Sequence, residues 1–192
     1  MQILEGIHKY LPNIKHVTTY ARADSIARKS VSELRELKTA GIEHLYCGME
    51  TGSDLILRKI NKGFDAATII ISGTKAKEAG MVLSEFTLFG IGGKELAEEN
   101  AVETAKVLNV IKPDFVRVHA TGIKLSSEMW NYVKNKELTL QSEEEIVSEQ
   151  KIMLELLADD MDCIYMNEHI VNLLLEVRGN IRTDKQNMLE SN

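Results

Sequence analysis

The sequence is poor in the residues that build covalent or metal-bound frameworks. Its 192 residues include two cysteines, two prolines and one tryptophan. Cys47 and Cys163 stand far apart in the sequence, which argues against a disulfide framework, and two thiols by themselves cannot form a four-thiolate zinc or iron–sulfur site. Unpaired cysteines are typical of a reducing compartment, and we therefore expect a cytoplasmic protein.

Long apolar runs and basic tracts are also missing. No run approaches the roughly 18 apolar residues that a membrane-spanning helix requires, so we expect no membrane partner. The chain carries 23 Lys and Arg residues against 29 Asp and Glu residues, which gives a formal net charge of −6. This mildly acidic balance argues against a surface that follows nucleic-acid phosphates.

What the sequence does contain is a repeating unit of amphipathic helix, small-residue stop and short apolar strand. At this length one domain, or one domain with a small appendage, is expected. Strands that alternate with helices indicate βαβ units and a parallel sheet, arranged as an arc of a (β/α) barrel or as an open sheet. The four expected strands are Val17–Tyr20, Ile42–Cys47, Val82–Phe89 and Phe115–His119.

Local signals mark where the helices begin and end. Ser30 with Glu33, and Ser142 with Glu145, have the spacing of a capping box, in which each residue satisfies a backbone N–H group of the other. Asp65 can cap a further helix, which ends at the small-residue stop 79–80 because glycine adopts the left-handed conformation at low cost.

The C-terminal third departs from this pattern. A loop and a short helix are expected over Leu125–Asn135, followed by a long helix from Ser142 to about Ala158. Beyond that helix, Ile170–Val177 is apolar. Gly179–Asn192 is polar, and we expect it to form a loosely held tail.

The residues that follow the expected strands are the candidates for chemistry, because parallel sheets bind ligands at the carboxyl ends of their strands. Three of the four ends carry glycines, which let a backbone approach a ligand closely. Glu50 follows the second strand, and its carboxylate can accept two hydrogen bonds from a ribose diol. Arg22, Arg58 or Lys62 can hold a carboxylate or a phosphate.

Each candidate also has a structural interpretation that the sequence leaves open. The glycines can simply shape turns, Arg22 can form a surface pair with Asp24, and Glu50 can cap the following helix. The Gly90–Gly93 turn does not match the dinucleotide-binding fingerprint, because the spacing of its glycines is different. His119, at the end of the fourth strand, is as consistent with a structural histidine as with a ligand-binding one.

Two segments nevertheless match a known family. Residues 40–54 (AGIEHLYCGMETGSD) are followed by residues 57–63 (LRKINKG). This pattern resembles the fourth strand and its loop in radical S-adenosylmethionine (SAM) enzymes, in the branch of elongator-type and oxygen-independent coproporphyrinogen oxidase-like proteins. Tyr20–Asp24, Phe86–Gly93 and Phe115–His119 resemble the third, fifth and sixth strand ends of that branch, and they occur in the same order.

The resemblance runs from about residue 14 to residue 160. It implies a partial (β/α) TIM-like barrel with parallel strands in residues 1–140, and a C-terminal helical extension in residues 141–192. It also implies that SAM lies across the strand ends. By carry-over, the cofactor-binding residues are Arg22, Glu50, Thr51, Lys62, Gly90, Ile91, Gly92, Val118 and His119.

These residues have different roles by the resemblance. Glu50, with Thr51 beside it, binds the ribose or the methionyl polar groups, Lys62 meets the methionyl carboxylate, and Arg22 supports that carboxylate or the ribose. The glycine turn at residues 90–92 approaches the cofactor through its backbone. Residues 118 and 119 flank the adenine.

One departure from the family pattern is decisive for the expected activity. The family's reaction requires a C-x3-C-x2-C loop, whose three thiolates hold a 4Fe-4S cluster that binds SAM, and this sequence has no such loop. The resemblance therefore implies a C-terminal piece of a larger enzyme, inactive alone, whose parent protein binds SAM, the cluster and an unidentified substrate. Val17–Tyr20 would then be a sheet edge, which we expect to self-associate or to be covered by the N-terminal helix.

Two other classes of function remain open from the sequence. The chain can be a complete small α/β lyase or isomerase that uses Glu50 with Lys62 or Arg22. It can also be a noncatalytic module whose strand ends bind a nucleotide or a protein. The family-like order of the four strand ends favours the radical SAM fragment over both alternatives.

Overall fold

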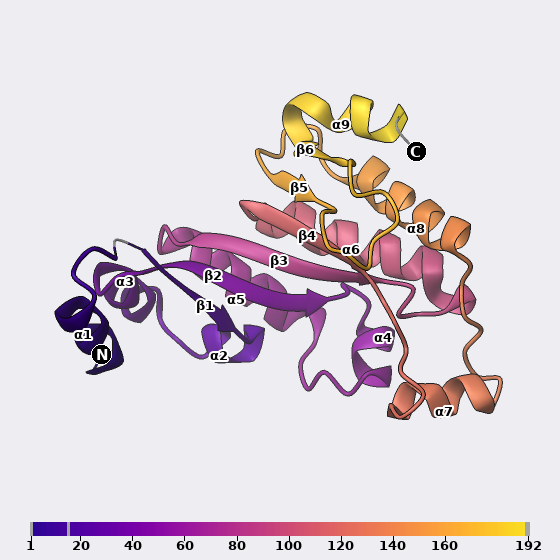
Figure 1. The fold of residues 1–192 in the computed structure, drawn as a ribbon, viewed down its shortest axis with the longest axis horizontal. Coiled ribbons are helices and arrows are strands. Elements are labelled where there is room, and N and C mark those ends of the chain that lie inside the picture. Colours follow the sequence, from indigo (N-terminus) through magenta and orange to yellow (C-terminus); the bar gives the residue numbers. More distant parts are fainter. Residues whose placement is uncertain (1, 15, 191–192) are drawn as a thin grey trace.

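The protein is a mixed α/β fold built on one six-stranded sheet, seen in a computed structural model that describes residues 2–14 and 16–190 (Figure 1). The strands lie side by side in chain order and the first five are parallel, which is the arrangement of a partial (β/α) TIM-like barrel. The sixth strand is antiparallel. The strands are β1 (Val17–Ala21), β2 (Ile42–Glu50), β3 (Val82–Phe89), β4 (Phe115–Ala120), β5 (Ile164–Met166) and β6 (Arg178–Asn180).

One face of the sheet is covered by a continuous layer of helices. In this layer α5 contacts α2, α3 and α6, α6 contacts α8, and α8 contacts α9. Figure 1 shows α7 set apart from this layer, on the connection that leaves β4. The helices are α1 (Gln2–Tyr10), α2 (Ala23–Ala27), α3 (Val31–Thr39), α4 (Asp54–Lys59), α5 (Ala66–Glu78), α6 (Ala97–Ile111), α7 (Glu128–Lys134), α8 (Glu143–Leu156) and α9 (Ile181–Glu190), with a short 3₁₀ helix at Lys94–Leu96.

The two faces of the sheet differ in burial because side chains alternate along a strand. In β2, Leu45, Cys47 and Met49 are buried under the helices, while Tyr46 and Gly48 point to the other face and remain partly exposed. The core therefore lies between the sheet and the helix layer, and the opposite face is left for contact with other molecules.

The expected helix signals are confirmed. Both capping boxes form, at Ser30 with Glu33 and at Ser142 with Glu145, and the Asp65 side chain accepts the amide of Thr68 at the start of α5. The strand expected at Val82–Phe89 has the same bounds in the structure. The strand β2 is longer than expected and continues to Glu50, which places that residue at the sheet itself.

The expectation of a loose C-terminal tail was wrong for the described residues up to 190. The tail folds into β6 and α9, and it buries Ile181 and Met188 against the core. Lys185 fastens α9 to the end of α8 by donating to the carbonyls of Glu155 and Leu157 at 2.9 and 2.6 Å. Two widely spaced apolar residues are enough to anchor a helix, although they barely change the average polarity of the segment.

The sheet also has two more strands than the sequence indicated, since β5 and β6 are each only three residues long and give little periodic signal. β5 extends the parallel part of the sheet beyond β4, and β6 pairs with it in the antiparallel direction. Within the described residues, no helix is long and apolar enough to cross a membrane.

Candidate functional site

The carboxyl end of β2 has an unusual backbone. Glu50 adopts the left-handed conformation with φ 64°, and the pairing register with β3 shifts between Gly48 and Glu50. A left-handed glutamate is sterically unfavourable, and such residues cluster at functional sites where surrounding structure holds them. Glu50 alternates with the buried Met49 and lies on the open face of the sheet with Tyr46 and Gly48.

Glu50 forms a close ion pair with Lys62. The Lys62 Nζ atom lies 2.6 Å from Glu50 Oε1, and each side chain is only about one-fifth exposed. A methyl group at Gly48 would collide with Glu50 Oε1 and lie 3.4 Å from Lys62 Nζ, so the carboxylate occupies the space that glycine leaves empty. The helix that follows is capped by Ser53, which excludes the interpretation of Glu50 as its cap.

Arg22 supports the loop that carries Lys62. Its Nη2 atom donates to the Lys62 carbonyl at 3.1 Å, and its guanidinium carbon lies 5.3 Å from the centre of the Phe64 ring. Its Nε atom donates to Asp24 at 3.0 Å, so the expected surface pair is also present. These three contacts connect the end of β1 to the loop after α4 and place a second cation near Glu50.

The glycine turn after β3 is held by a buried carboxylate. The amide of Gly90, whose φ is +82°, donates to Glu149 Oε2 at 3.0 Å. Glu149 also accepts hydrogen bonds from Asn100 Nδ2 at 2.6 Å and Gln141 Nε2 at 2.9 Å. Burial raises the pKa of Glu149, and the three donors act in the opposite direction. Glu149 of α8, itself held by Asn100 of α6, therefore fixes the position of the turn.

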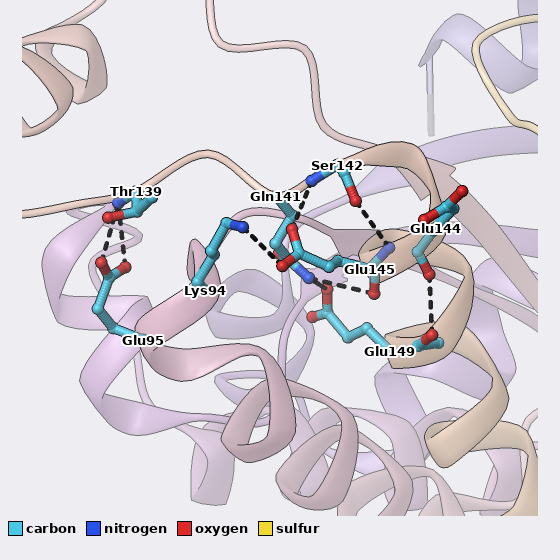
Figure 2. Close-up of polar contacts among 9 residues, drawn as sticks. Lys94, Glu95, Thr139, Gln141, Ser142, Glu144, Glu145 and Glu149 are labelled. Carbon is cyan, nitrogen blue, oxygen red and sulfur yellow. Dashed lines mark hydrogen bonds and ion pairs between the residues drawn. The ribbon is translucent and has the colours of Figure 1, made fainter.

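Figure 2 shows the surroundings of this carboxylate at the start of α8. Gln141 reaches Glu149 there, and Glu145 closes the capping box with Ser142 and pairs with Lys94 Nζ at 2.6 Å. These contacts join the segment after the glycine turn to the first turn of α8.

The open face of β1–β4 is lined by aromatic rings. Tyr20 and Tyr46 meet edge to face at 5.4 Å between ring centres, and Tyr20 stacks on Phe86 at 6.1 Å. Phe86 contacts the His119 ring at 5.3 Å. A cavity of about 450 Å³ lies over these rings and ends at the Glu50–Lys62 pair. Such a surface can hold a planar ring next to polar groups.

The structure brings together four of the sequence-predicted residues: Arg22, Glu50, Lys62 and His119 line this cavity. Thr51 and Val118 are fully buried and Ile91 is nearly so, and none of the three lines this cavity. The Val118 carbonyl already accepts a hydrogen bond from Asn172 Nδ2 at 2.6 Å. Gly90 and Gly92 lie in the turn held by Glu149.

The surroundings of His119 favour its neutral form. Burial lowers the pKa of His119, and the neighbouring His169, 4.1 Å away between ring centres, lowers it further. A neutral imidazole can stack on a base or form hydrogen bonds with it without adding charge.

Sequence reasoning missed the residues that line the open face within the strands, ahead of the carboxyl ends. Tyr20, Tyr46, Phe86 and Arg117 share this face because they occupy alternate positions of adjacent strands. The alternation of His44 with Tyr46 in β2, and of Phe115, Arg117 and His119 in β4, is a signal that could have identified this face.

The described residues do not offer a metal site. No group of three or more His, Cys, Asp or Glu side chains among them is placed to hold a metal ion. Cys47 and Cys163 are both buried, and burial raises the pKa of both thiols, that of Cys163 to about 12. A buried thiol of this kind is a small apolar core residue, and this agrees with its position under the helices.

No family model and no curated protein sequence matches this chain. Solved structures do match it. The archaeal Methanocaldococcus infernus Elp3, with an N-terminal deletion, has a TM-score of 0.62 and 17% identity, over 75% of this chain and 33% of its own. Coproporphyrinogen III oxidase (HemN) from Escherichia coli, a radical SAM enzyme, has a TM-score of 0.57 and 15% identity, over 80% and 35%. Methylornithine synthase (PylB) has a TM-score of 0.55 and 14% identity, over 99% and 48%.

These similarities are similarities of fold. The chain spans between a third and a half of the length of the structures it matches. Its sheet and helices therefore correspond to part of the fold that a radical SAM enzyme uses.

Proposed function

We propose that this chain forms the SAM-binding part of a radical SAM barrel, with the barrel in residues 1–140 and an extension in residues 141–192. The observation that carries the proposal is the Glu50–Lys62 pair, in which Glu50 is a left-handed residue at the carboxyl end of β2. The pair opens onto an aromatic cavity in a fold shared with HemN, a radical SAM enzyme.

The residues present fit the polar groups of SAM. The Glu50 carboxylate can accept hydrogen bonds from the two ribose hydroxyls, and the Lys62 ammonium attracts the methionyl carboxylate. Arg22 holds the Lys62 loop and adds positive charge. The His119 ring would lie against the adenine, whereas Val118 and the glycine turn at residues 90–92 are buried and would act only by shaping the strand ends. Bound SAM supplies the sulfonium whose cleavage starts the family's radical chemistry.

The residues present do not fit a 4Fe-4S cluster. The whole sequence has two cysteines, both buried, and three thiolates are needed. We therefore derive no step through the cluster and propose that its ligands come from polypeptide outside these 192 residues. The chain alone is then a binding unit without catalytic activity. Reconstitution with iron and sulfide should give no 4Fe-4S absorbance, and a stoichiometric cluster on this chain would contradict the proposal.

The test of SAM binding is an amide-shift titration of the ¹⁵N-labelled chain by NMR. Because the cluster that anchors the methionyl group is absent, we expect weak binding. The shifts should be confined to the ends of β1–β4, and Glu50→Ala should weaken the affinity about tenfold or more, the loss expected for charge-assisted hydrogen bonds.

The matched control is Glu103→Ala, which breaks the pair with Lys106 that has the same 2.6 Å distance but lies on α6, outside the cavity. It should leave SAM binding unchanged. Shifts scattered over the helix layer, or equal affinity for the chain and its Glu50→Ala variant, would refute the assignment of this site.

A further inference from the structure

The open face continues past the Glu50–Lys62 pair to a second cavity of about 360 Å³. It shares Tyr20, Tyr46, Phe86 and His119 with the first cavity, but its charged residues are Arg117, in the middle of β4, and Glu168. In the strand register Gly48, Phe86 and Arg117 are neighbours on three adjacent strands. Strand spacing therefore places Arg117 about 10 Å from the position over which the Glu50 carboxylate lies.

Arg117 lacks a counter-ion in the described part of the chain. None of its carboxylates lies within ion-pair distance of the guanidinium. The only hydrogen bonds recorded for its side chain are long, 3.4 Å each, to Tyr46 Oη and Ser84 Oγ. Glu168 lines the same cavity, but it forms an ion pair with Arg178. A partly buried guanidinium with two weak neutral acceptors is ready to accept an anion.

The rings around Arg117 add a shape requirement. Its guanidinium carbon lies 5.0, 6.0 and 5.7 Å from the ring centres of Tyr46, Phe86 and Phe115. His119 and His169 stack beside the same cavity at 4.1 Å. Flat apolar walls select a planar molecule, and the single cation selects an acidic group on it.

We propose that this second cavity binds an aromatic or heteroaromatic anion, whose ring lies on Phe86 and Tyr46 and whose carboxylate or phosphate pairs with Arg117. If this anion is also the substrate that reacts, that role rests on the proposed SAM site, because the two cavities share their rings and lie side by side. Binding of the anion itself does not depend on that site.

The probe is 2-naphthoate, titrated into the full 192-residue chain and followed by ligand-observed and amide-observed NMR. Two analogues separate the requirements: 2-naphthamide keeps the rings without the charge, and cyclohexanecarboxylate keeps the charge without the aromatic ring. The acid should bind at least about tenfold more tightly than either analogue, because each analogue loses one of the two interactions. Equal binding of all three molecules would overturn the proposal.

Variants assign the site. Arg117→Gln should weaken 2-naphthoate about tenfold or more while leaving 2-naphthamide unchanged, and Arg117→Lys should restore part of the affinity because the charge is kept. The control Arg35→Gln removes an exposed arginine of α3 and should have no effect. Circular dichroism checks that each variant is folded. If Arg117→Gln is not folded, Arg117→Lys, which keeps the charge, is measured in its place. Binding that Arg117→Gln does not alter would refute the site.

The two proposals fail in different ways. If Arg117 instead holds the methionyl carboxylate of SAM, Arg117→Gln should abolish SAM binding and 2-naphthoate should not bind, which would overturn the second site alone. If Glu50→Ala leaves SAM binding intact, the first site fails, and the 2-naphthoate result still stands as a separate measurement.

Discussion

At the scale of single residues, the site depends on one glutamate in a strained conformation and one glycine beneath it. Glu50 stays left-handed because its carboxylate is held by Lys62 over the bare backbone of Gly48. The arrangement positions a carboxylate and an ammonium together at a strand end, where they can recognise the two ends of a zwitterionic ligand.

Gly48→Ala tests this arrangement directly. The new methyl group would overlap Glu50 Oε1 and force the ion pair to move. Because the overlap is with the flexible end of a side chain, we expect little loss of stability but weaker SAM binding. Urea unfolding and the NMR titration measure the two effects. The matched control is Gly6→Ala, where nothing lies within 4 Å of the new methyl group; an unperturbed SAM titration in Gly48→Ala would contradict this account.

A second residue, Glu85, is a buried acid whose loss of hydration is not offset by a hydrogen bond in the described part of the chain. Glu85 is 1% exposed on the helix-covered face of β3, in register with Cys47, and neither carboxylate oxygen has a hydrogen-bond partner. Burial raises the pKa of Glu85 well above its ordinary value of 4.5, and the nearby Glu50 charge raises it further, while Lys62 acts against both. The carboxyl is therefore a protonated group in the folded core over a wider pH range than in the unfolded chain.

The sign of the pH effect follows from this shift. Below about pH 4.5 the carboxyl is protonated in both states, and as the pH rises the unfolded chain ionises first, so stability is lost until the folded pKa is reached. Glu85→Met removes the effect and should stabilise the fold by about 1–4 kcal/mol at neutral pH, with a smaller gain at pH 4. Urea unfolding at both pH values measures it. The exposed Glu36→Met is the control, and a gain independent of pH would contradict the prediction.

At the scale of elements, the glycine turn after β3 is set by α8, which lies far along the chain. The turn's first amide, the Asn100 side chain of α6 and the Gln141 side chain before α8 all converge on Glu149. A loop between two elements is thus held by a third, which explains how a turn rich in glycine keeps a defined conformation.

Glu149→Gln tests the role of this carboxylate. Its amide nitrogen would face a donor, so at least one of the three hydrogen bonds is lost, with an expected destabilisation of about 1–3 kcal/mol. Hydrogen exchange at Gly90 should become faster relative to the centre of α6. Glu144→Gln, an exposed change in the first turn of the same helix (Figure 2), is the control. Unchanged exchange at the glycine turn would show that Glu149 does not hold it.

At the scale of the whole molecule, the sheet is an arc with one face covered by helices and one face open. In the described chain β1 pairs only with β2, so its other side is an edge of the sheet. The Tyr20 side chain on this edge strand is 77% exposed. A free edge with an exposed aromatic residue favours pairing with another chain, either a second copy or the rest of a barrel.

Self-association through this edge remains a prediction. Thr18→Lys places a charge on an exposed position of β1 and should shift the chain toward the monomer in sedimentation velocity, because charged edge residues oppose strand pairing. Ser148→Lys, exposed on α8, is the control for the added charge. A chain that is monomeric at high concentration without any substitution would contradict the prediction.

The sequence by itself determined much of the local structure and predicted which strand ends carry polar side chains. The capping boxes, the glycine stops and the strand β3 could be predicted because their signals act within a few residues. The strand-end rule and the resemblance together predicted Arg22, Glu50, Lys62 and His119, and the structure places these four residues around one cavity; their binding of a ligand stays a prediction.

Only the tertiary structure decided which distant residues meet. The pairing of Glu50 with Lys62 over Gly48, the hold of Glu149 on the glycine turn and the unpaired Arg117 among aromatic rings all depend on strand register and helix packing. The docking of α9 likewise depends on a groove that several elements form together. Such contacts are set by burial and by complementary charge across the fold, and no short stretch of sequence encodes them.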